Sequence, residues 1–596
     1  MTTSGAAESF RPYPFDFRRH APPMPGALHV DRVHPIAIVG GGIAGLTLAL
    51  DLAVQGIRSV VIEADDSVCF GSRAICFSRR SLEIYERLGV AAPMLEKGLA
   101  WTGGRSFYRH DEVLHFRMPH DRMQKLPPMI NLQQYRVEDI LVDALERHAG
   151  LVDLRWQSRV VAATQHPDHV ELQVEQPGAS YPLRSHWVVA CDGGRSTLRE
   201  TAGLRLQGTA YEGRYVVADI ALACDLPTER LAWFDPPSNP GSTILMHRQP
   251  DDIWRIDYQL RDDEDGDAAV QPATVLPRVE AHLKMIGLAE SWHPIWITLY
   301  KANALTLPHY RRGRFLFAGD AAHLVPIFGV RGANSTIDDV DNLAWKLALV
   351  VDGKADPSLL DSYSTERVKA AHENLAYGRK STQFMAPPDF VFRSMREAVL
   401  SLALDTPALR PLINPRQSSP VRYDDSPLNA TPPRDDGFDA GPAAGAVLPS
   451  APVAWLDDKG IARPGFLADM LAPGRFTILQ FDTRGPVPQA LRTVAAGLIG
   501  RGIGVRLVSV RNETGPTGAD LQALDAAGDA TRLYGATRGA VYLVRPDGHV
   551  SGRWRSEGAR AAAEADAETD NGLAAAVAAA ITACLGRRLE ENRETP

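Results

Sequence analysis

A glycine-rich turn between a buried strand and a helix constrains the fold of this chain more than any other feature. The apolar run at residues 36–39 predicts a parallel strand, and a helical pattern follows the turn. Gly40 permits a tight turn, Gly42 lets the backbone approach a phosphate, and Gly45 lets the helix pack closely on the strand. With a second strand at residues 59–63, this is the βαβ unit that binds a dinucleotide pyrophosphate at a helix N-terminus.

The acidic residue that ends the second strand supports this interpretation. Glu63 follows Gly42 by 21 residues and can accept hydrogen bonds from an adenosine ribose. A glycine-rich turn without a ligand is the alternative. We expect the turn and the first helical residues to line the cofactor, namely Gly40, Gly41, Gly42, Ile43, Ala44 and Gly45.

Two further apolar runs end in aspartate. Residues 187–191 lead to Asp192, and residues 315–319 lead to Asp320. Ligands of open α/β sheets bind at the carboxyl ends of the strands. Between these runs, alternating patterns from about 211 to 298 predict a mostly antiparallel sheet.

The segment from residue 314 to 347 resembles the class A flavoprotein monooxygenases, which are single-component aromatic hydroxylases. The motifs that carry the resemblance are Gly319-Asp320-Ala321-Ala322-His323, Pro326, Gly332-Ala333-Asn334, Asn342-Leu343-Ala344-Trp345-Lys346-Leu347 and Asp192-Gly193-Gly194-Arg195-Ser196. The resemblance covers roughly residues 33–385 and implies that the bound dinucleotide is FAD.

The resemblance also assigns roles to single residues. Asp320 is expected to accept hydrogen bonds from the flavin ribityl chain, and the helix that begins near Gly332, Ala333 and Asn334 to stabilise negative charge on the flavin ring. Further cofactor contacts implied by the family are Arg73, Gln134, Val160 (near the adenine) and Asp192 (near the pyrophosphate and linked to NAD(P)H use). The ordinary alternatives are a solvated arginine and glutamine, a core valine and an aspartate that caps a turn.

The loop before this helix departs from the family pattern, which reads Pro-Pro-x-x-Gly-x-Gly. It runs here from Pro326 to Gly332, with Val330 in place of a glycine and Arg331 where glutamine is common. We expect Pro326 and Arg331 to belong to the catalytic loop. Arg331 either meets a substrate carboxylate, reaches the flavin or points to solvent.

The chemistry that the resemblance implies is hydroxylation of a phenolic or related aromatic through a flavin hydroperoxide, with dioxygen and a transiently bound NADH or NADPH. A base must take the phenolic proton. The candidates on the central sheet are Tyr258, His247, Tyr215 and Tyr211, of which Tyr258 and His247 are the leading ones. Trp254, Ile256 and Tyr258 alternate onto one sheet face, which suits an aromatic-lined pocket. An ordinary core tyrosine is the alternative.

Three other functions compete with this one: a flavin-dependent halogenase, a reductase of the same fold and a non-catalytic FAD-binding protein. The Trp-x-Trp-x-Ile-Pro stretch expected of halogenases is absent from the sequence. The net charge of −8 gives no indication of nucleic-acid binding, and the five scattered cysteines predict neither a metal site nor a disulfide framework. We expect a cytoplasmic protein with no membrane segment, and a homodimer is compatible with the sequence.

The predicted organisation is α/β, with a Rossmann-like FAD-binding domain, an inserted antiparallel sheet domain for the substrate, and a C-terminal domain. The expected boundaries are 30–205 and 301–395 for the FAD-binding domain with its interdomain helices, 206–300 for the sheet domain, 396–440 for a linker and 441–590 for the C-terminal domain. Through the stretch from Leu533-Tyr534-Gly535 to Tyr542-Leu543-Val544-Arg545-Pro546-Asp547-Gly548, the C-terminal domain resembles the thioredoxin-like appendage of phenol hydroxylases. Cys584 is its only cysteine, so we expect a packing or dimerisation role instead of redox chemistry.

Overall fold

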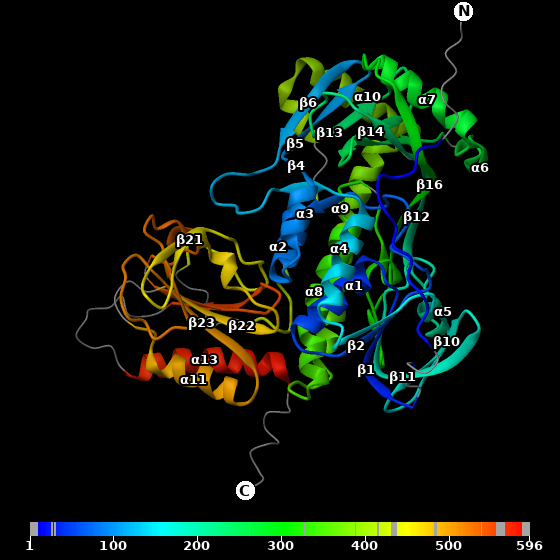
Figure 1. Cartoon of the computed structure of the whole chain (residues 1–596). Coiled ribbons are helices and arrows are strands. Elements are labelled where there is room, and N and C mark those ends of the chain that lie inside the picture. The colour runs from blue at the N-terminus through cyan, green and yellow to red at the C-terminus, as the bar shows by residue number, and fades with distance from the viewer. Residues whose placement is uncertain are drawn as a thin grey trace, which may run out of the picture.

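A computed structural model gives the structure of the chain and comprises two large sheets in its first 330 residues and a third after residue 450 (Figure 1). The described residues are 10–24, 28, 31–261, 263–326, 328–387, 389–413, 417–430, 438–481, 486–537, 539–555 and 567–586.

The first sheet is the predicted βαβ framework. Its parallel strands lie in the spatial order β18 (Phe315–Phe317), β11 (Ala179–Ala190), β1 (Val33–Val39), β2 (Ser59–Ile62) and β8 (Val152–Arg155). The short strand β17 (Arg311–Arg312) pairs antiparallel with β18 at the edge. An antiparallel extension on β11 consists of β10 (Val170–Gln176) and β9 (Arg159–Gln165). β1 and β2 are almost entirely buried, which explains why their sequences are apolar without alternation.

Helices separate this sheet from the C-terminal domain (Figure 1). They are α1 (Ile43–Val54), α2 (Arg79–Arg87), α3 (Ala91–Lys97), α4 (Gln134–Glu146), α8 (Gly332–Val351) and α9 (Leu359–Met385). α8 packs on α1, α2 and α9, and most of its side chains are buried, including polar ones such as Asn342 and Lys346. A helix buried on all sides needs partners for those polar groups.

The second sheet is antiparallel except for one parallel pair, as the alternating sequence pattern predicts. Its strands are β19 (His323–Leu324), β16 (Trp292–Thr306), β12 (Gln207–Leu222), β15 (Ile253–Gln259), β14 (Thr243–Gln249), β13 (Arg230–Phe234), β5 (Gly103–Tyr108) and β6 (Asp111–Arg117). α7 (Pro272–Met285) packs on one face of this sheet. β5 and β6 lie inside residues 30–205, so the predicted boundary at 206 misses two strands of the sheet domain.

The remaining short elements complete the first two thirds of the chain. They are β3 (Cys76–Ser78), β7 (Met129–Asn131) and β4 (Leu99–Trp101), which form a small sheet, with α5 (Thr197–Thr201), α6 (Gly266–Ala269) and the 3₁₀ turn η2 (Gly319–Ala321).

The predicted linker at 396–440 is wrong in its first part. α10 (Phe390–Asp405) and the 3₁₀ helix η3 (Pro407–Leu412) occupy it, and α10 contacts β6 of the second sheet. The sequence contains little indication of this helix, because α10 buries only Arg396, Leu400 and Ala403 and leaves large apolar residues exposed, so that no regular apolar face marks it.

The C-terminal domain is built on the third sheet, in which β22, β23 and β24 are parallel. Its strands in spatial order are β21 (Ala462–Phe466), β20 (Pro452–Leu456), β24 (Leu521–Leu524), β23 (Gly504–Arg511), β22 (Arg475–Phe481), β25 (Ala540–Val544) and β26 (Val550–Trp554). Its helices are η4 (Leu467–Met470), α11 (Gln489–Gly500), α12 (Asp529–Leu533) and α13 (Ala567–Leu585), with α11 and α13 packed together.

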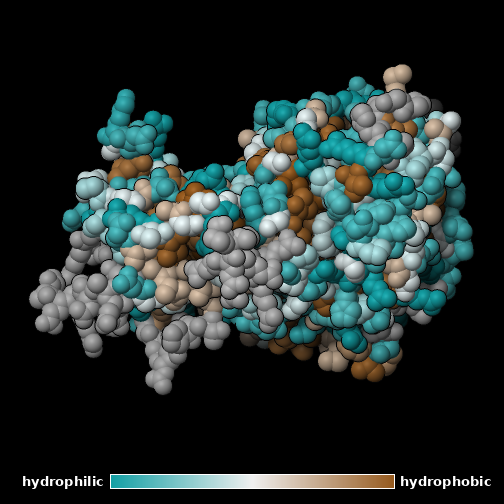
Figure 2. Space-filling model, turned by 90° about the horizontal axis from the view of Figure 1, so that it is seen from below, coloured by the Kyte–Doolittle hydropathy of each residue, from teal (hydrophilic) through white to brown (hydrophobic). Residues whose placement is uncertain are grey.

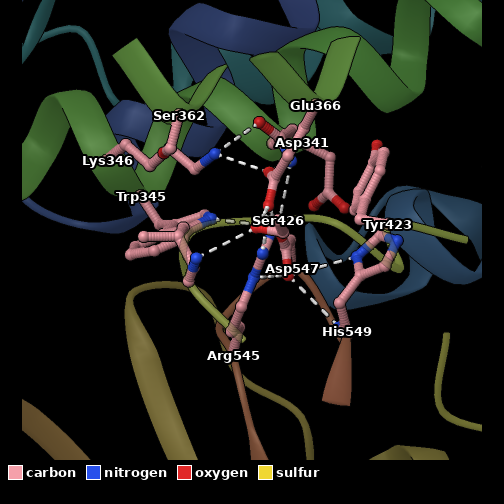
Figure 3. Close-up of polar contacts among 12 residues, drawn as sticks. Asp341, Trp345, Lys346, Ser362, Glu366, Tyr423, Ser426, Arg545, Asp547 and His549 are labelled. Carbon is pink, nitrogen blue, oxygen red and sulfur yellow. Dashed lines mark hydrogen bonds and ion pairs between the residues drawn. The ribbon is translucent and has the colours of Figure 1, made fainter. Parts of the chain in front are cut away.

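A buried charged cluster joins the C-terminal domain to α8 and α9 (Figure 3). Arg545, which follows β25, donates to Glu366 Oε1 at 2.5 Å and Oε2 at 3.0 Å and also pairs with Asp547. Lys346 Nζ lies 2.7 Å from Glu366 Oε2, and all four side chains are 0% exposed. The C-terminal domain therefore supplies one of the two cations, beside Lys346 of α8, that balance a carboxylate of the first domain.

Over the face of the molecule seen in Figure 2, hydrophobic residues lie in small groups among hydrophilic ones. None of the helices in the described ranges is long and apolar enough to cross a bilayer.

Candidate active site

The glycine-rich turn adopts a geometry that only glycine fits. Gly40 has a φ of +110°, and a Cβ there would lie 2.3 Å from the carbonyl oxygen of Cys191. A Cβ on Gly45 would lie 1.9 Å from the carbonyl oxygen of Gly40. Gly42 caps α1 without any side-chain hydrogen bond, so the first-turn amides at Ile43 and beyond present the positive end of the helix at the turn.

Glu63 lies directly beside this turn. Its carboxylate accepts hydrogen bonds from the amides of Gly41 and, at 2.8 Å, Asp65. Desolvation raises its pKa, and these two amides partly offset the effect. The backbone of Glu63 also accepts from the amide of Ser158 at 2.7 Å, two residues before the buried Val160. The turn, the acidic strand end and the start of β9 thus lie together, and Val160 itself packs in the buried core, so that its place near the adenine stays a prediction.

Asp192 lies on the other side of the turn. Its Oδ2 accepts from the amide of Leu198 at 3.2 Å, whereas its buried Oδ1 has no partner among the described residues. A buried carboxylate oxygen without a donor indicates that a ligand or solvent group completes it.

The strand end at Asp320 faces outward from a buried turn. Gly319, Ala321 and Ala322 are buried, but the side chain of Asp320 is exposed. Desolvation by the surrounding protein raises the pKa of Asp320, and the attraction of His323 and Arg73 partly offsets this effect. Arg73, itself exposed and held at a φ of +32°, therefore lies close to Asp320.

A buried hydrogen-bonded triad that the sequence did not predict fixes this turn to the helices behind it. Asp339 of α8 accepts from the Gly319 amide at 3.0 Å, from His323 Nε2 at 2.6 Å and from Arg367 Nε at 2.6 Å. The side chains of His323, Asp339 and Arg367 are at most 1% exposed. His323 belongs to the quoted motif, and its role is to hold the turn.

The side chains of Gln134 and Asn334 tie loops together. Gln134 accepts from the amide of Ala74 at 3.1 Å and donates to Glu138 at 2.8 Å. Asn334 Oδ1 accepts from the Ser78 amide, and its Nδ2 donates to two backbone carbonyls. The N-terminus of α8 at Gly332 and Ala333, where a Cβ on Gly332 would meet no atom within 4 Å, is the part of this loop open to a ligand.

Glu138 is a further buried residue that the sequence did not predict at this site. It accepts a hydrogen bond from the Cys69 amide at 2.8 Å, and its Oε1 would lie 3.7 Å from a Cβ added to Gly42. Its only sequence signal is an acidic residue on an otherwise apolar helix face.

The loop before α8 is strained at Val330, which has a φ of +50°. This conformation favours glycine, the residue that the family pattern has there. Pro326 is buried and packs on Gly378, where an added Cβ would lie 3.3 Å from Pro326 Cδ. Arg331 is 2% exposed, donates to Asn374 at 2.9 Å, and lies over the ring of Tyr377. Its side chain therefore packs toward α9, which does not support a substrate contact.

The two favoured base candidates lie on opposite faces of the second sheet. Tyr258 is 1% exposed and packs in the cluster under α7, with Arg278 over its ring at 5.4 Å. That cluster also contains Trp254, so the aromatic stripe forms a core and not a substrate pocket. Tyr258 is therefore no longer a candidate base.

His247 lies on the face turned toward the predicted cofactor loops. Its Nδ1 is 4.0 Å from Cys76 Sγ, and Tyr215 on the same face contacts the ring of Phe328 at 5.1 Å. Desolvation, helped by nearby Arg230 and Arg255, lowers the pKa of His247 to about 3. A neutral imidazole of such low basicity is a poor proton acceptor. The side chain of Tyr211 lies outside the described residues.

A family model for an FAD binding domain matches residues 34–377, more than half of the chain. The chain belongs to this family. The residues fit FAD, because the turn at Gly40 excludes any side chain, Asp192 Oδ1 has no donor within the described part of the chain and Asp320 stands exposed on a buried turn. The predicted resemblance to flavoprotein monooxygenases is confirmed.

Curated relatives are similar over nearly their full length. A 6-methylpretetramide 4-monooxygenase from Streptomyces rimosus is 30% identical over 88% of this chain and 91% of its own. A 3-(3-hydroxy-phenyl)propionate/3-hydroxycinnamic acid hydroxylase from Mycobacterium avium (strain 104) is 28% identical over 89% of this chain and 90% of its own.

Solved structures share the fold. A flavin-dependent monooxygenase in complex with FAD and substrate aligns with a TM-score of 0.75 at 23% identity, over 92% of this chain and 99% of its own. Aklavinone-11 hydroxylase with FAD and aklavinone aligns with a TM-score of 0.71 at 22% identity, over 93% of this chain and 100% of its own. The shared fold includes the C-terminal part of the chain.

Proposed function

We propose that this FAD-dependent monooxygenase hydroxylates a phenolic or related aromatic compound, using NADH or NADPH and dioxygen. The observation that carries the proposal is the juxtaposition of two sites. The Asp320 turn and the α8 N-terminus lie beside loop 72–76, and that loop contacts the face of the second sheet that carries Arg255 and His247. The names of the curated relatives support an aromatic substrate.

The cofactor would be held by backbone at one end and carboxylates at both. The Gly40–Gly45 turn and the N-terminus of α1 would bind the pyrophosphate, Glu63 the adenosine ribose and Asp320 the ribityl hydroxyls. FAD bound there supplies the electron transfer from nicotinamide and the activation of oxygen. The α8 N-terminus at Gly332 and Ala333 would stabilise negative charge on the ring.

The protein's own contribution at the substrate side is exclusion of water. The face of the sheet that meets these loops is covered by a buried apolar cluster that includes Trp101, Tyr215, Phe328, Met385 and Leu400. An apolar surround strengthens the electrostatic contacts of the reacting groups and prevents side reactions.

The C-terminal domain is proposed to be a thioredoxin-like domain without redox function. Parallel strands β22 to β24, continued by antiparallel β25 and covered by α11 and α13, support this. Cys584 is buried, and desolvation raises the pKa of its thiol to about 11, which suppresses the reactive thiolate. A cytoplasmic location and a homodimer remain predictions.

Aerobic NAD(P)H oxidation with and without a phenol tests the function. We expect a phenol to accelerate oxidation and to gain one oxygen atom. Oxidation that yields only hydrogen peroxide for every phenol tested would contradict a hydroxylase and favour a reductase of the same fold.

A further inference from the structure

A row of charged side chains crosses the face of the second sheet that meets the cofactor loops. The strand register aligns Leu231 with Met246, which places Arg230 opposite His247. His247 pairs with Arg255, and Arg255 pairs with Asp219. Neighbours in such a row have Cβ atoms about 5 Å apart.

One end of this row is fully paired. Arg255 Nε lies 3.3 Å from Asp219 Oδ1, and its Nη1 donates to the backbone oxygen of Arg73 at 2.5 Å. Asp219 also accepts from Tyr13 at 2.7 Å and Gln249 at 3.1 Å. This pairing fixes the sheet to the loop that carries Arg73.

The other end of the row is not paired. Arg230 is 4% exposed, and no hydrogen bond or ion pair within the described ranges reaches its guanidinium group. Desolvation lowers its pKa to about 10. A buried cation without a bonded anion is unfavourable, so its retention indicates that a ligand supplies the anion.

Asp257 lies one pleat further along the same face. It pairs in register with Leu245 and Val217, is 4% exposed, and its Oδ1 has no partner among the residues described. Desolvation raises its pKa to about 7, and the neighbouring arginines partly offset this. Arg230 and Asp257 are near enough for each to shift the pKa of the other, yet they form no ion pair in the described structure. This arrangement suits a ligand group bound between them.

We propose that Arg230 binds an anionic oxygen of the aromatic substrate, either a carboxylate or a phenolate, and that Asp257 accepts the phenolic proton. In this step the substrate O–H bond breaks, the proton passes to the Asp257 carboxylate, and the electron pair stays on the substrate oxygen. The proposal rests on the proposed function, because it assigns the substrate groups of the same site.

Ligand titration of the FAD-loaded protein, followed by flavin absorbance, tests Arg230 without any turnover. The probes are 3-(3-hydroxyphenyl)propionate, its amide and 3-phenylpropionate. The variants are Arg230→Met, Arg230→Lys and, as a matched control, Arg105→Met. Arg105 lies on the adjacent strand β5, is 38% exposed and pairs with Glu229 and Glu112, so its removal leaves the proposed site intact.

We expect Arg230→Met to raise the Kd of the hydroxylated acid about 10- to 100-fold, because the substrate anion loses a charged hydrogen-bond donor. Arg230→Lys should raise this Kd less, and Arg105→Met should leave it unchanged. If the carboxylate is the anion, 3-phenylpropionate loses affinity and the amide does not. If the phenolate is the anion, the amide loses affinity and 3-phenylpropionate does not. An unchanged Kd for all probes in Arg230→Met, or a wild-type protein that binds none of them, overturns the proposal.

The role of Asp257 is tested by turnover. Asp257→Asn should lower the hydroxylation rate at least 10-fold while the Kd of 3-phenylpropionate stays within threefold of wild type. A rate equal to that of wild type overturns its role as base. Because the titration needs neither NAD(P)H nor oxygen, failure of the Arg230 site is distinguishable from failure of the hydroxylase function.

Discussion

Removal of Arg545 should weaken the attachment of the C-terminal domain to the cofactor domain. Its guanidinium group is 0% exposed and holds both Glu366 and Asp547 (Figure 3). In Arg545→Met, the remaining cation beside Glu366 is Lys346, and Asp547 keeps the hydrogen bond from Trp345 Nε1 at 3.2 Å and its contact with His549 Nδ1 at 3.3 Å.

The magnitude follows from burial. Breaking a buried ion pair from one side costs about 3–5 kcal/mol, because an uncompensated charge stays in the interior. Two carboxylates lose Arg545 here, which places the expected cost in the upper part of that range. An exposed interdomain pair offers a matched comparison: Arg122, 67% exposed, pairs with Asp529, and ion pairs in contact with water contribute little to stability.

Hydrogen exchange read by mass spectrometry on peptides from β22 and β25 measures this cost locally, without assuming two-state unfolding of a multidomain chain. Exchange in Arg545→Met should be faster by about 100-fold or more, and in Arg122→Met by less than about tenfold. Equal acceleration in both variants would refute the argument that burial makes Arg545 decisive.

The effect should depend on pH with a definite sign. Desolvation raises the pKa of Glu366, but the combined attraction of Arg545 and Lys346 outweighs it and leaves the pKa lowered. A lowered carboxyl pKa stabilises the folded state above the unfolded pKa, and this contribution disappears as pH falls. The difference between Arg545→Met and wild type should therefore shrink below about pH 4.5.

Three further predictions follow from single contacts. Gly45→Ala should destabilise the protein by about 3 kcal/mol and abolish FAD retention, measured by flavin absorbance after gel filtration, because its Cβ would lie 1.9 Å from the Gly40 oxygen; a stable yellow variant would contradict this. At Val330, where φ is +50°, Val330→Gly should be more stable in urea than Val330→Ala by about 1 kcal/mol, the reverse of the usual order; the usual order would show that the loop is unstrained. Burial raises the pKa of Asp257 to about 7, with a contribution from Asp219, although Arg255 and Arg230 partly offset it. The hydroxylation rate should therefore fall as pH drops through 7, and a pH profile of Asp257→Asn should lack this step.

The cofactor half of the site was predictable because its chemistry follows from backbone conformation and strand ends. Gly40, Gly45, Glu63 and Asp320 lie where a local βαβ pattern and a short motif place them. The parallel order of β11, β1 and β2 follows from the same pattern. The boundaries of the sheet domain were less predictable, because the parallel pairing of β5 with β13 joins segments over 100 residues apart.

The substrate half was missed because a strand presents two faces and the sequence does not say which is the core. The aromatic residues Trp254 and Tyr258 favoured one face, yet α7 buries it. Arg255 and Asp257, on the other face of the same strand, lie toward the cofactor loops. The charged residues Arg255 and Asp257 on this alternating strand were a better indication of the functional face than the aromatic residues, because charged side chains are rarely buried in an apolar core.

Long-range ion pairs were also beyond the sequence. Glu366 and Arg545 are separated by 179 residues, and Asp339 meets Arg367 across two helices. Nothing in the local pattern of α8 distinguishes a carboxylate that anchors a turn from one that faces solvent. These partners are brought together only when α9 and the C-terminal domain pack on this helix, so they can be identified only from the folded structure.

Turnover of a phenolic acid with isotopically labelled dioxygen tests the central claim most directly. The purified protein should be yellow with bound FAD, should oxidise NAD(P)H faster when the phenol is present, and should transfer one labelled oxygen atom to the ring. A protein that does not bind FAD, or one whose product carries oxygen from water instead of dioxygen, would contradict the account.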